Sequence, residues 1–116
     1  MLKIGTVVYA DVKIMNDAFL YNNCKVIEFA KKLISDFGLT EVKSVSHHFD
    51  GHGLTYVGIL SESHLAIHTW PEYRYMAIDL FTCGNHDLSN FDKYIKELFE
   101  VESINVAIKE RIVTGI

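Results

Sequence analysis

Four strand-like segments follow one another closely between residues 40 and 83, and they constrain the fold more than any other feature of the chain. Each segment is rich in β-branched and aromatic residues or alternates between apolar and polar side chains, as strands do. The segments are 40–49, 54–60, 64–70 and 74–83. The breaks between them are too short for a crossover to a parallel neighbour, which takes a dozen or more residues. The pattern therefore predicts consecutive antiparallel strands joined by hairpins.

Two helical patterns and two further strands complete the predicted fold. Behind Asn16 and Asp17, apolar residues recur every three or four positions, which predicts one amphipathic helix that ends at Gly38. A second helix is expected after a cap at Asp87 or Ser89. Its apolar stripe consists of Phe91, Tyr94, Ile95, Leu98 and Phe99. The first and last strands of the chain are expected at 2–10 and 103–112. The order β-α-β-β-β-β-α-β predicts an α+β two-layer sandwich, an antiparallel sheet with both helices on one face.

Composition limits the class of protein. With 116 residues, 49% of them hydrophobic, the chain corresponds to a single domain, residues 1–116, and not to a disordered sequence. The net charge of −4 without a dense Lys or Arg cluster predicts no nucleic-acid partner. No apolar stretch approaches the ~20 residues that cross a bilayer, so no membrane partner is expected. Two cysteines are too few for a disulfide framework, which predicts a cytoplasmic protein with free thiols. Cys24 lies on the helical stripe and is expected to be a small buried residue.

The segment 61–84 concentrates hydroxyl, carboxylate, imidazole, indole and thiol groups. Strand alternation places His68 and Trp70 on one face and the aliphatic residues on the other. A hairpin with the next strand would lay this face beside the one that carries Cys83. Each residue also has a purely structural interpretation: Ser63 as a turn former, the histidine as a hydrogen-bonded sheet residue, and the thiol as a core residue. No Cys-x-x-Cys or His-Glu-x-x-His spacing is present, so no metal site is expected.

Three motifs in this segment resemble the small prokaryotic S-adenosylmethionine decarboxylase proenzyme family. They are Ser61-Glu62-Ser63-His64-Leu65, Ile67-His68-Thr69-Trp70-Pro71-Glu72-Tyr73 and Asp79-Leu80-Phe81-Thr82-Cys83-Gly84. The resemblance implies a pyruvoyl cofactor that the chain makes from its own Ser63. The serine hydroxyl would attack the carbonyl of Glu62, the amide would become an ester, and elimination and hydrolysis would leave the pyruvoyl group. The products would be a β chain of residues 1–62 and an α chain of residues 63–116.

The resemblance also implies roles in proton transfer. His68 would be the proton acceptor in self-cleavage. Thr55 would support it from the previous strand, at a position where the family usually has serine. The substrate amine would form a Schiff base with the pyruvoyl group, and Cys83 would donate the proton that follows decarboxylation. A thiol suits this role because it can hold a proton at neutral pH and still release it.

The implied substrate is S-adenosylmethionine, whose decarboxylated product serves spermidine synthesis. Phe49 and Trp70 would stack on the adenine, and Glu72 would bind the ribose hydroxyls. Phe49 also has a structural alternative, as a core residue at the end of a strand. Members of the family assemble as dimers of αβ units, so a homodimer is expected. The small core of a 116-residue chain gives a physical reason for such association.

The chain departs from the family pattern at three places. The family commonly has histidine where this chain has Val7, glycine where it has Arg74, and a different hairpin sequence at residues 50–56. Arg74 could pair with a substrate carboxylate or lie in solvent. The changes leave open a pyruvoyl-dependent arginine or ornithine decarboxylase of the same ancestry, in which Asp50 and Glu72 would contact the substrate cation. An unprocessed, non-catalytic homologue that binds a partner and an unrelated α+β binding domain are the remaining alternatives.

Overall fold

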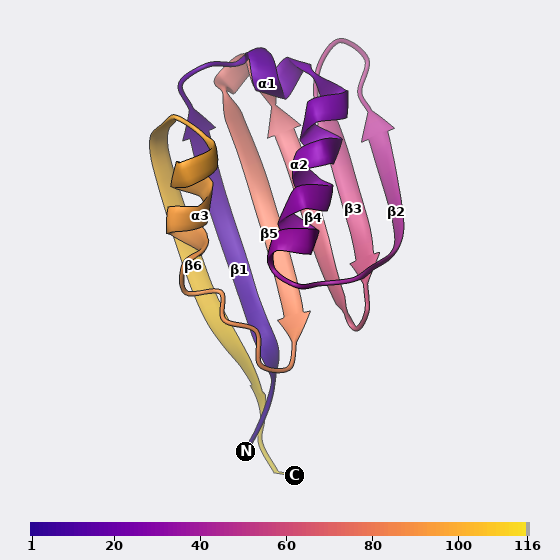
Figure 1. Cartoon of the computed structure of the whole chain (residues 1–116), viewed down its shortest axis with the longest axis vertical. Helices are drawn as coiled ribbons and strands as arrows, with labels where there is room; N and C mark the ends of the chain where they lie inside the picture. Colours follow the sequence, from indigo (N-terminus) through magenta and orange to yellow (C-terminus); the bar gives the residue numbers. More distant parts are fainter. Residues whose placement is uncertain (116) are drawn as a thin grey trace.

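The computed structural model describes residues 1–115 and has one antiparallel sheet with helices packed against it (Figure 1). Its elements are β1 (Leu2–Ile14), α1 (Ala18–Tyr21), α2 (Asn23–Asp36), β2 (Glu41–His48), β3 (Leu54–Leu60), β4 (Ser63–Trp70), the 3-10 turn η1 (Pro71–Tyr73), β5 (Tyr75–Cys83), α3 (Phe91–Leu98) and β6 (Val101–Val113). Every strand expected from the sequence is present, with boundaries that differ by a few residues.

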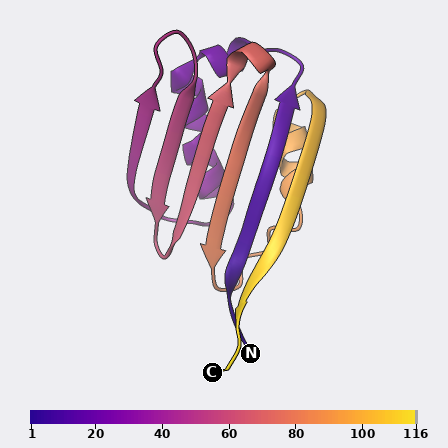
Figure 2. The same ribbon diagram turned by 180° about the vertical axis from the view of Figure 1, so that it is seen from behind.

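The strands lie in the order β2-β3-β4-β5-β1-β6, and each pairing is antiparallel. β1 therefore lies between β5 and β6, so that the first and last strands of the chain are neighbours. α2 and α3 cover one face of the sheet, whereas the other face, which we call the helix-free face, carries no helix (Figures 1 and 2). The predicted two-layer α+β sandwich with both helices on one face is confirmed.

Side-chain alternation along the central strands fixes which residues face the helices. In β4, Leu65 and Ile67 are completely buried, while His64 is exposed and His68 is partly buried on the helix-free face. β5 alternates in the same way: its buried residues are Met76, Ile78, Leu80 and Thr82. Burying one Leu or Ile side chain stabilises the fold by roughly 1.5–3 kcal/mol. A shift of the strand pairing by one residue would expose all of these buried side chains. Core packing therefore fixes the register and keeps the polar residues on the helix-free face.

The first predicted helix is in fact two helices. Asn22 has non-helical backbone angles (φ −101°, ψ 95°) between α1 and α2, and its side chain caps α2 by accepting a hydrogen bond from the Lys25 N–H at 3.1 Å. The break shifts the phase of the apolar stripe, so Val26 and Phe29 are buried and Cys24 is exposed. The prediction that Cys24 is a buried residue is therefore wrong.

The second predicted helix begins later than the sequence suggested. Its N-cap residue is Asn90, not Asp87 or Ser89. The Asp87 carboxylate instead accepts hydrogen bonds from the Ser89 N–H at 2.9 Å and from the Ser89 hydroxyl at 2.6 Å, in the turn before α3. These bonds hold the pKa of Asp87 below its ordinary value. The first and last strands of the chain are longer than predicted because β1 and β6 pair with each other along almost their full length.

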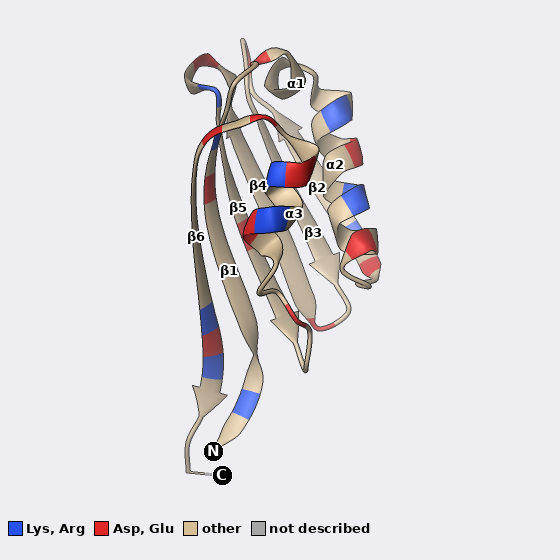
Figure 3. Cartoon of the chain, turned by 60° about the vertical axis from the view of Figure 1, so that its left-hand side comes forward, with Lys and Arg blue, Asp and Glu red and all other residues tan. Residues whose placement is uncertain are grey.

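Charge is distributed unevenly between the two layers. Lys, Arg, Asp and Glu lie mainly on the helices, the loops and the ends of β1 and β6, whereas Asp79 is the only such residue in β3, β4 and β5 (Figure 3). Large apolar side chains are exposed on the helix-free face, namely Tyr9, Val45, Ile59 and Trp70. Among residues 1–115, no helix is long and apolar enough to span a bilayer.

Candidate active site

Glu62, Ser63 and Cys83 meet where the β3–β4 hairpin turns, and we call them the serine cluster. The Cys83 N–H donates a hydrogen bond to Ser63 Oγ at 3.2 Å, and the Cys83 thiol donates to the carbonyl oxygen of Glu62 at 2.6 Å. The Ser63 hydroxyl is 3.4 Å from the carbonyl oxygen of Ser61, to which it donates. Residues distant in sequence touch here because the antiparallel pairing of β4 with β5 brings the start of one strand beside the end of the other.

The serine cluster has the groups needed for an intramolecular acyl transfer. Attack of Ser63 Oγ on the Glu62 carbonyl carbon closes a five-membered ring and places negative charge on the carbonyl oxygen. A donor already placed on that oxygen lowers the barrier, and loss of one such donor in other enzymes costs about 10²–10³ in rate. The Cys83 thiol occupies that position. The cluster therefore fits the formation of a pyruvoyl group at residue 63.

Thr55, His68 and Trp70 form a second group on the helix-free face, which we call the histidine cluster. Thr55 lies directly opposite His68 in the β3–β4 pairing, and Thr55 Oγ1 lies 3.0 Å from His68 Nδ1. This hydrogen bond orients the imidazole and leaves its Nε2 free to exchange a proton. The ring centroids of His68 and Trp70 are 6.2 Å apart. The structure thus places Thr55 beside His68, as its expected supporting role requires.

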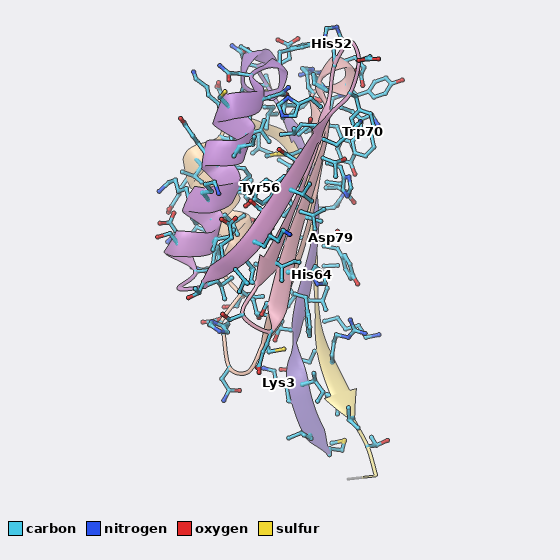
Figure 4. All side chains as sticks on the ribbon, turned by 90° about the vertical axis from the view of Figure 1, so that its right-hand side faces the viewer. Lys3, His52, Tyr56, His64, Trp70 and Asp79 are labelled. Atoms are coloured by element: carbon cyan, nitrogen blue, oxygen red, sulfur yellow. The ribbon has the colours of Figure 1, made fainter. Side chains whose placement is uncertain are left out.

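The two clusters lie toward opposite ends of β4. Ser63 is the first residue of the strand and His68 is five positions further along it. At ~3.3 Å per residue, roughly 16 Å separates them along the strand. Figure 4 shows two residues near the ends of β4, His64 and Trp70, at different heights of the molecule. Alternation along β4 places His68 and Trp70 on the helix-free face, but the two clusters do not meet within one chain.

The three residues expected to bind substrate lie at the His68 end of the sheet. Phe49 follows β2 and is 52% exposed, and its N–H donates a hydrogen bond to the Gly53 carbonyl oxygen at 3.0 Å. Its structural alternative as a core residue is therefore wrong. Trp70 ends β4 and is 40% exposed, and Glu72 is exposed in η1. Glycine at position 53 lets the turn approach β4 closely. Its φ of +108° would strain any other residue, and a Cβ there would lie 3.1 Å from the Thr69 carbonyl oxygen.

Arg74 has a defined partner within its own chain. It has a left-handed backbone (φ 55°), and its guanidinium donates to the Ile14 carbonyl oxygen at 3.3 Å and to Glu102 at 3.2 Å. Lys13 also pairs with Glu102 at 3.0 Å, and a hydrogen bond from Lys13 is the main cause of the lowered pKa of Glu102. The Arg74 side chain therefore joins the corner between η1 and β5 to β1 and β6. The expected alternative of a free side chain in solvent is therefore wrong, and pairing with a substrate carboxylate stays a prediction.

Two residues beside the histidine cluster were missed by sequence reasoning. The rings of Trp70 and Tyr75 stack with centroids 5.2 Å apart and an interplanar angle of 27°. The Tyr75 hydroxyl donates to Asp11 at 2.5 Å. Burial, together with this hydrogen bond, raises the pKa of Tyr75 to about 12. Tyr75 and Asp11 thereby support Trp70 from β5 and β1. The Trp70–Tyr75 stack lies across the predicted hairpin of β4 and β5, whereas the Tyr75–Asp11 bond has no signal in the sequence because it depends on the pairing of β1 with β5.

The altered hairpin at residues 50–56 packs against the first helix. The His52 ring meets the Tyr21 ring edge to face, with centroids 4.7 Å apart. Asp50 is exposed in the same turn.

Within residues 1–115, no group of three or more His, Cys, Asp or Glu side chains is arranged to hold a metal ion.

The fold and these side chains define an α+β enzyme with an internal serine, a thiol and an imidazole on paired strands. A family profile described as S-adenosylmethionine decarboxylase matches residues 6–112. The S-adenosylmethionine decarboxylase proenzyme of Fervidobacterium nodosum is 44% identical over 92 residues, covering 78% of this chain and 67% of its own length. That of Archaeoglobus fulgidus is 32% identical over 111 residues, covering 93% of this chain and 97% of its own.

A solved structure agrees with these sequence relatives. The crystal structure of the adenosylmethionine decarboxylase from Aquifex aeolicus superposes with a TM-score of 0.86 at 25% identity, covering 99% of this chain and 96% of that one. The chain belongs to the S-adenosylmethionine decarboxylase family. The resemblance carried by the three sequence motifs is confirmed.

Proposed function

We propose that this protein is an S-adenosylmethionine decarboxylase that cuts its own chain between Glu62 and Ser63 and works with the pyruvoyl group made there. The fragments are residues 1–62 and 63–116. One observation carries the proposal: Cys83 donates to Ser63 Oγ through its N–H and to the carbonyl oxygen of the Glu62–Ser63 bond through its thiol. The same residue thus holds the nucleophile and the oxygen on which charge develops.

Self-cleavage then proceeds in three steps. Ser63 Oγ bonds to the Glu62 carbonyl carbon, the C–N bond breaks, and the hydroxyl proton goes to the released amine, which leaves an ester. A base removes the α-proton of Ser63, and the Glu62 carboxylate leaves with the ester C–O electron pair. Water hydrolyses the resulting dehydroalanine to the pyruvoyl group and ammonia. An imidazole is suited to the second step because its ordinary pKa lies near neutral pH.

A second copy of the chain supplies that imidazole. Proton transfer needs the base within about 3 Å of the proton, directly or through one water, and His68 is roughly 16 Å from Ser63 along its own strand. Two copies that stack their helix-free faces about a two-fold axis near Ala66 would lay each histidine cluster over the serine cluster of the other copy. A homodimer with two equivalent sites follows, since a two-fold interface repeats every contact.

The character of the helix-free face supports this assembly. Tyr9, Val45 and Ile59 expose 49%, 66% and 53% of their surface there, and the central strands carry almost no charge. Apolar side chains on such a face gain ~25 cal/mol per Å² when a second sheet covers them. On the opposite face, α2 and α3 cover the central strands of the sheet, where Leu65, Ile67 and Ile78 are completely buried.

The substrate-binding residues lie where the dimer needs them. Phe49 and Trp70 offer aromatic faces for the adenine, and Glu72 offers a carboxylate for the ribose hydroxyls. The pyruvoyl ketone supplies an electron-withdrawing group that stabilises the charge left when carbon dioxide departs. Cys83, beside residue 63, is placed to return a proton to the substrate carbon. Arg74 is engaged with Glu102, so the departure at this position gives no reason to propose a different substrate.

We also propose a cytoplasmic location. Both cysteines are free, and Cys24 is exposed, which suits a reducing compartment.

Two measurements, chain cleavage on gels and release of labelled carbon dioxide, test the proposed function. The second is made with S-adenosylmethionine, arginine and ornithine as substrates. The proposal expects turnover of S-adenosylmethionine and loss of both cleavage and turnover in Ser63→Ala. Preferred turnover of arginine or ornithine would contradict the substrate assignment. Cleavage at the same bond in Ser63→Ala would contradict the role of the serine.

A further inference from the structure

The residue on the carbonyl side of the Glu62–Ser63 bond has an unfavourable backbone conformation. Among residues 1–115, Glu62 and Arg74 are the only non-glycine residues with positive φ, at 60° and 55°. The left-handed backbone of Arg74 is held by its bonds to Ile14 and Glu102. The Glu62 side chain is exposed and, in the described part of the chain, takes part in no hydrogen bond or ion pair that would offset its conformation. The strain at Glu62 is therefore uncompensated by its own side chain.

The geometry of the hairpin explains where this strain comes from. Leu60 pairs with Ser63, so Ser61 and Glu62 form a two-residue connection between β3 and β4. Two-residue hairpins favour turns with positive φ at the first or at both central residues, since these match the twist of the strands. Here only the second central residue, Glu62, has positive φ. That pattern belongs to a turn that fits hairpins poorly and that normally places glycine or asparagine at this position.

We propose that the left-handed backbone of Glu62 is stored strain that promotes the first step of self-cleavage. The inference rests on the proposed function, because it concerns the same bond. In that step the Ser63 Oγ–C bond forms, the Glu62 C–N bond breaks, and the hydroxyl proton moves to the nitrogen. The main-chain path from the Glu62 carbonyl carbon to Ser63 Cα then runs through Oγ and Cβ instead of through the amide nitrogen. The tight turn becomes one bond longer and loses its rigid amide, so its strain is released in the ester.

Strain release matters because an ester is normally less stable than the amide from which it forms. The left-handed conformation is unfavourable for every residue except glycine. Relief of this strain in the ester shifts the equilibrium from the amide toward the ester by about 5- to 30-fold. The same factor applies to the rate of cleavage when the shift precedes the slower removal of the Ser63 α-proton. Glycine at position 62 adopts positive φ without this cost and would abolish the advantage.

The first experiment compares Glu62→Gly with Glu62→Gln. Both remove the carboxylate, but only glycine removes the strain. Each chain is made by cell-free translation with labelled methionine, and conversion to the two fragments is followed on gels. We expect Glu62→Gly to be cut about 5- to 30-fold more slowly than Glu62→Gln. Glu62→Ala is the matched control, since it also removes the carboxylate but keeps a Cβ and therefore the strain, and it should be cut at the same rate as Glu62→Gln.

A second experiment separates strain from flexibility. In the uncleavable Ser63→Ala chain, Glu62→Gly should unfold at a higher temperature than Glu62→Gln, even though glycine also gains freedom in the unfolded state. Equal or faster cleavage of Glu62→Gly, or an unfolding temperature of its Ser63→Ala form at or below that of Glu62→Gln, would overturn the inference. A parental chain that stays intact would instead refute the proposed function, and the unfolding temperatures would still decide whether Glu62 is strained.

Discussion

A mixture of two inactive variants should restore self-cleavage if the site is shared between two copies. His68→Ala removes the base, and Ser63→Ala removes the nucleophile. Roughly 16 Å separates these residues along β4, whereas a general base works at about 3 Å. Each variant alone should therefore remain uncut or be cut about 10²–10⁴-fold more slowly, the usual worth of a positioned base. In a mixed dimer, one site combines the serine of the His68→Ala chain with the histidine of the Ser63→Ala chain.

The expected extent of rescue follows from random pairing. With equal amounts of the two chains, about half of the His68→Ala chains sit in mixed dimers, because a two-fold interface accepts either partner. About half of them should be cut, and the cut fraction should rise toward completion as Ser63→Ala is supplied in excess. The chains are co-expressed with different tags, mixed dimers are verified by native mass spectrometry, and the fragments are assigned by their tags.

A double variant provides the control. Ser63→Ala combined with His68→Ala in one chain pairs equally well but brings no imidazole, so it should rescue nothing. Mixed dimers in which the His68→Ala chain stays uncut would refute the shared site. So would parental cleavage of His68→Ala alone, because the imidazole would then be unnecessary.

Three further predictions concern single residues. Cys83→Ala should slow the acyl shift by about 10²–10³-fold, which makes the shift the slower step of cleavage, and should lose turnover, since its thiol lies on the Glu62 carbonyl oxygen. Gels and carbon dioxide release measure the two effects, and parental values for both would exclude the thiol. Phe49→Ala should weaken binding of S-adenosylmethionine by ~1–3 kcal/mol, measured as KM, if the ring stacks on adenine; an unchanged KM would exclude stacking. The pKa of Glu41 is lowered chiefly by its hydrogen bond from Tyr56, so its contribution to stability is present above the ordinary pKa near 4.5 and is lost as the pH falls further. The free energy of unfolding, measured with denaturant, should therefore fall less steeply with acid in Glu41→Gln than in the parent. An unchanged acid dependence would contradict this.

The fold could be predicted closely because its main determinant is local. Alternation in β4 assigns Leu65 and Ile67 to the core and His68 to the helix-free face, and the short breaks between strands allow only antiparallel hairpins. The position of β1 between β5 and β6 could not be predicted, since it depends on pairing between distant segments. The break at Asn22 was missed because the apolar spacing continues across it, and the exposure of Cys24 followed from the same error.

The sequence names candidate site residues, which stay predictions, but it does not give their arrangement in space. Alternation correctly places His68 on the helix-free face, but it gives no distance along the strand. The rise per residue in a strand, a quantity known without any structure, already separates Ser63 from His68 by roughly 16 Å. The left-handed backbone of Glu62 has no signal in the sequence, because glutamate is not a residue that marks such a turn.

The central claim is that the bond between Glu62 and Ser63 breaks without any other protein. The intact mass of freshly purified protein tests it most directly. The account predicts two chains, residues 1–62 and 63–116, the second lighter by one ammonia than a peptide that begins with serine. A single uncut chain, or a second fragment that begins with an unmodified serine, would contradict it.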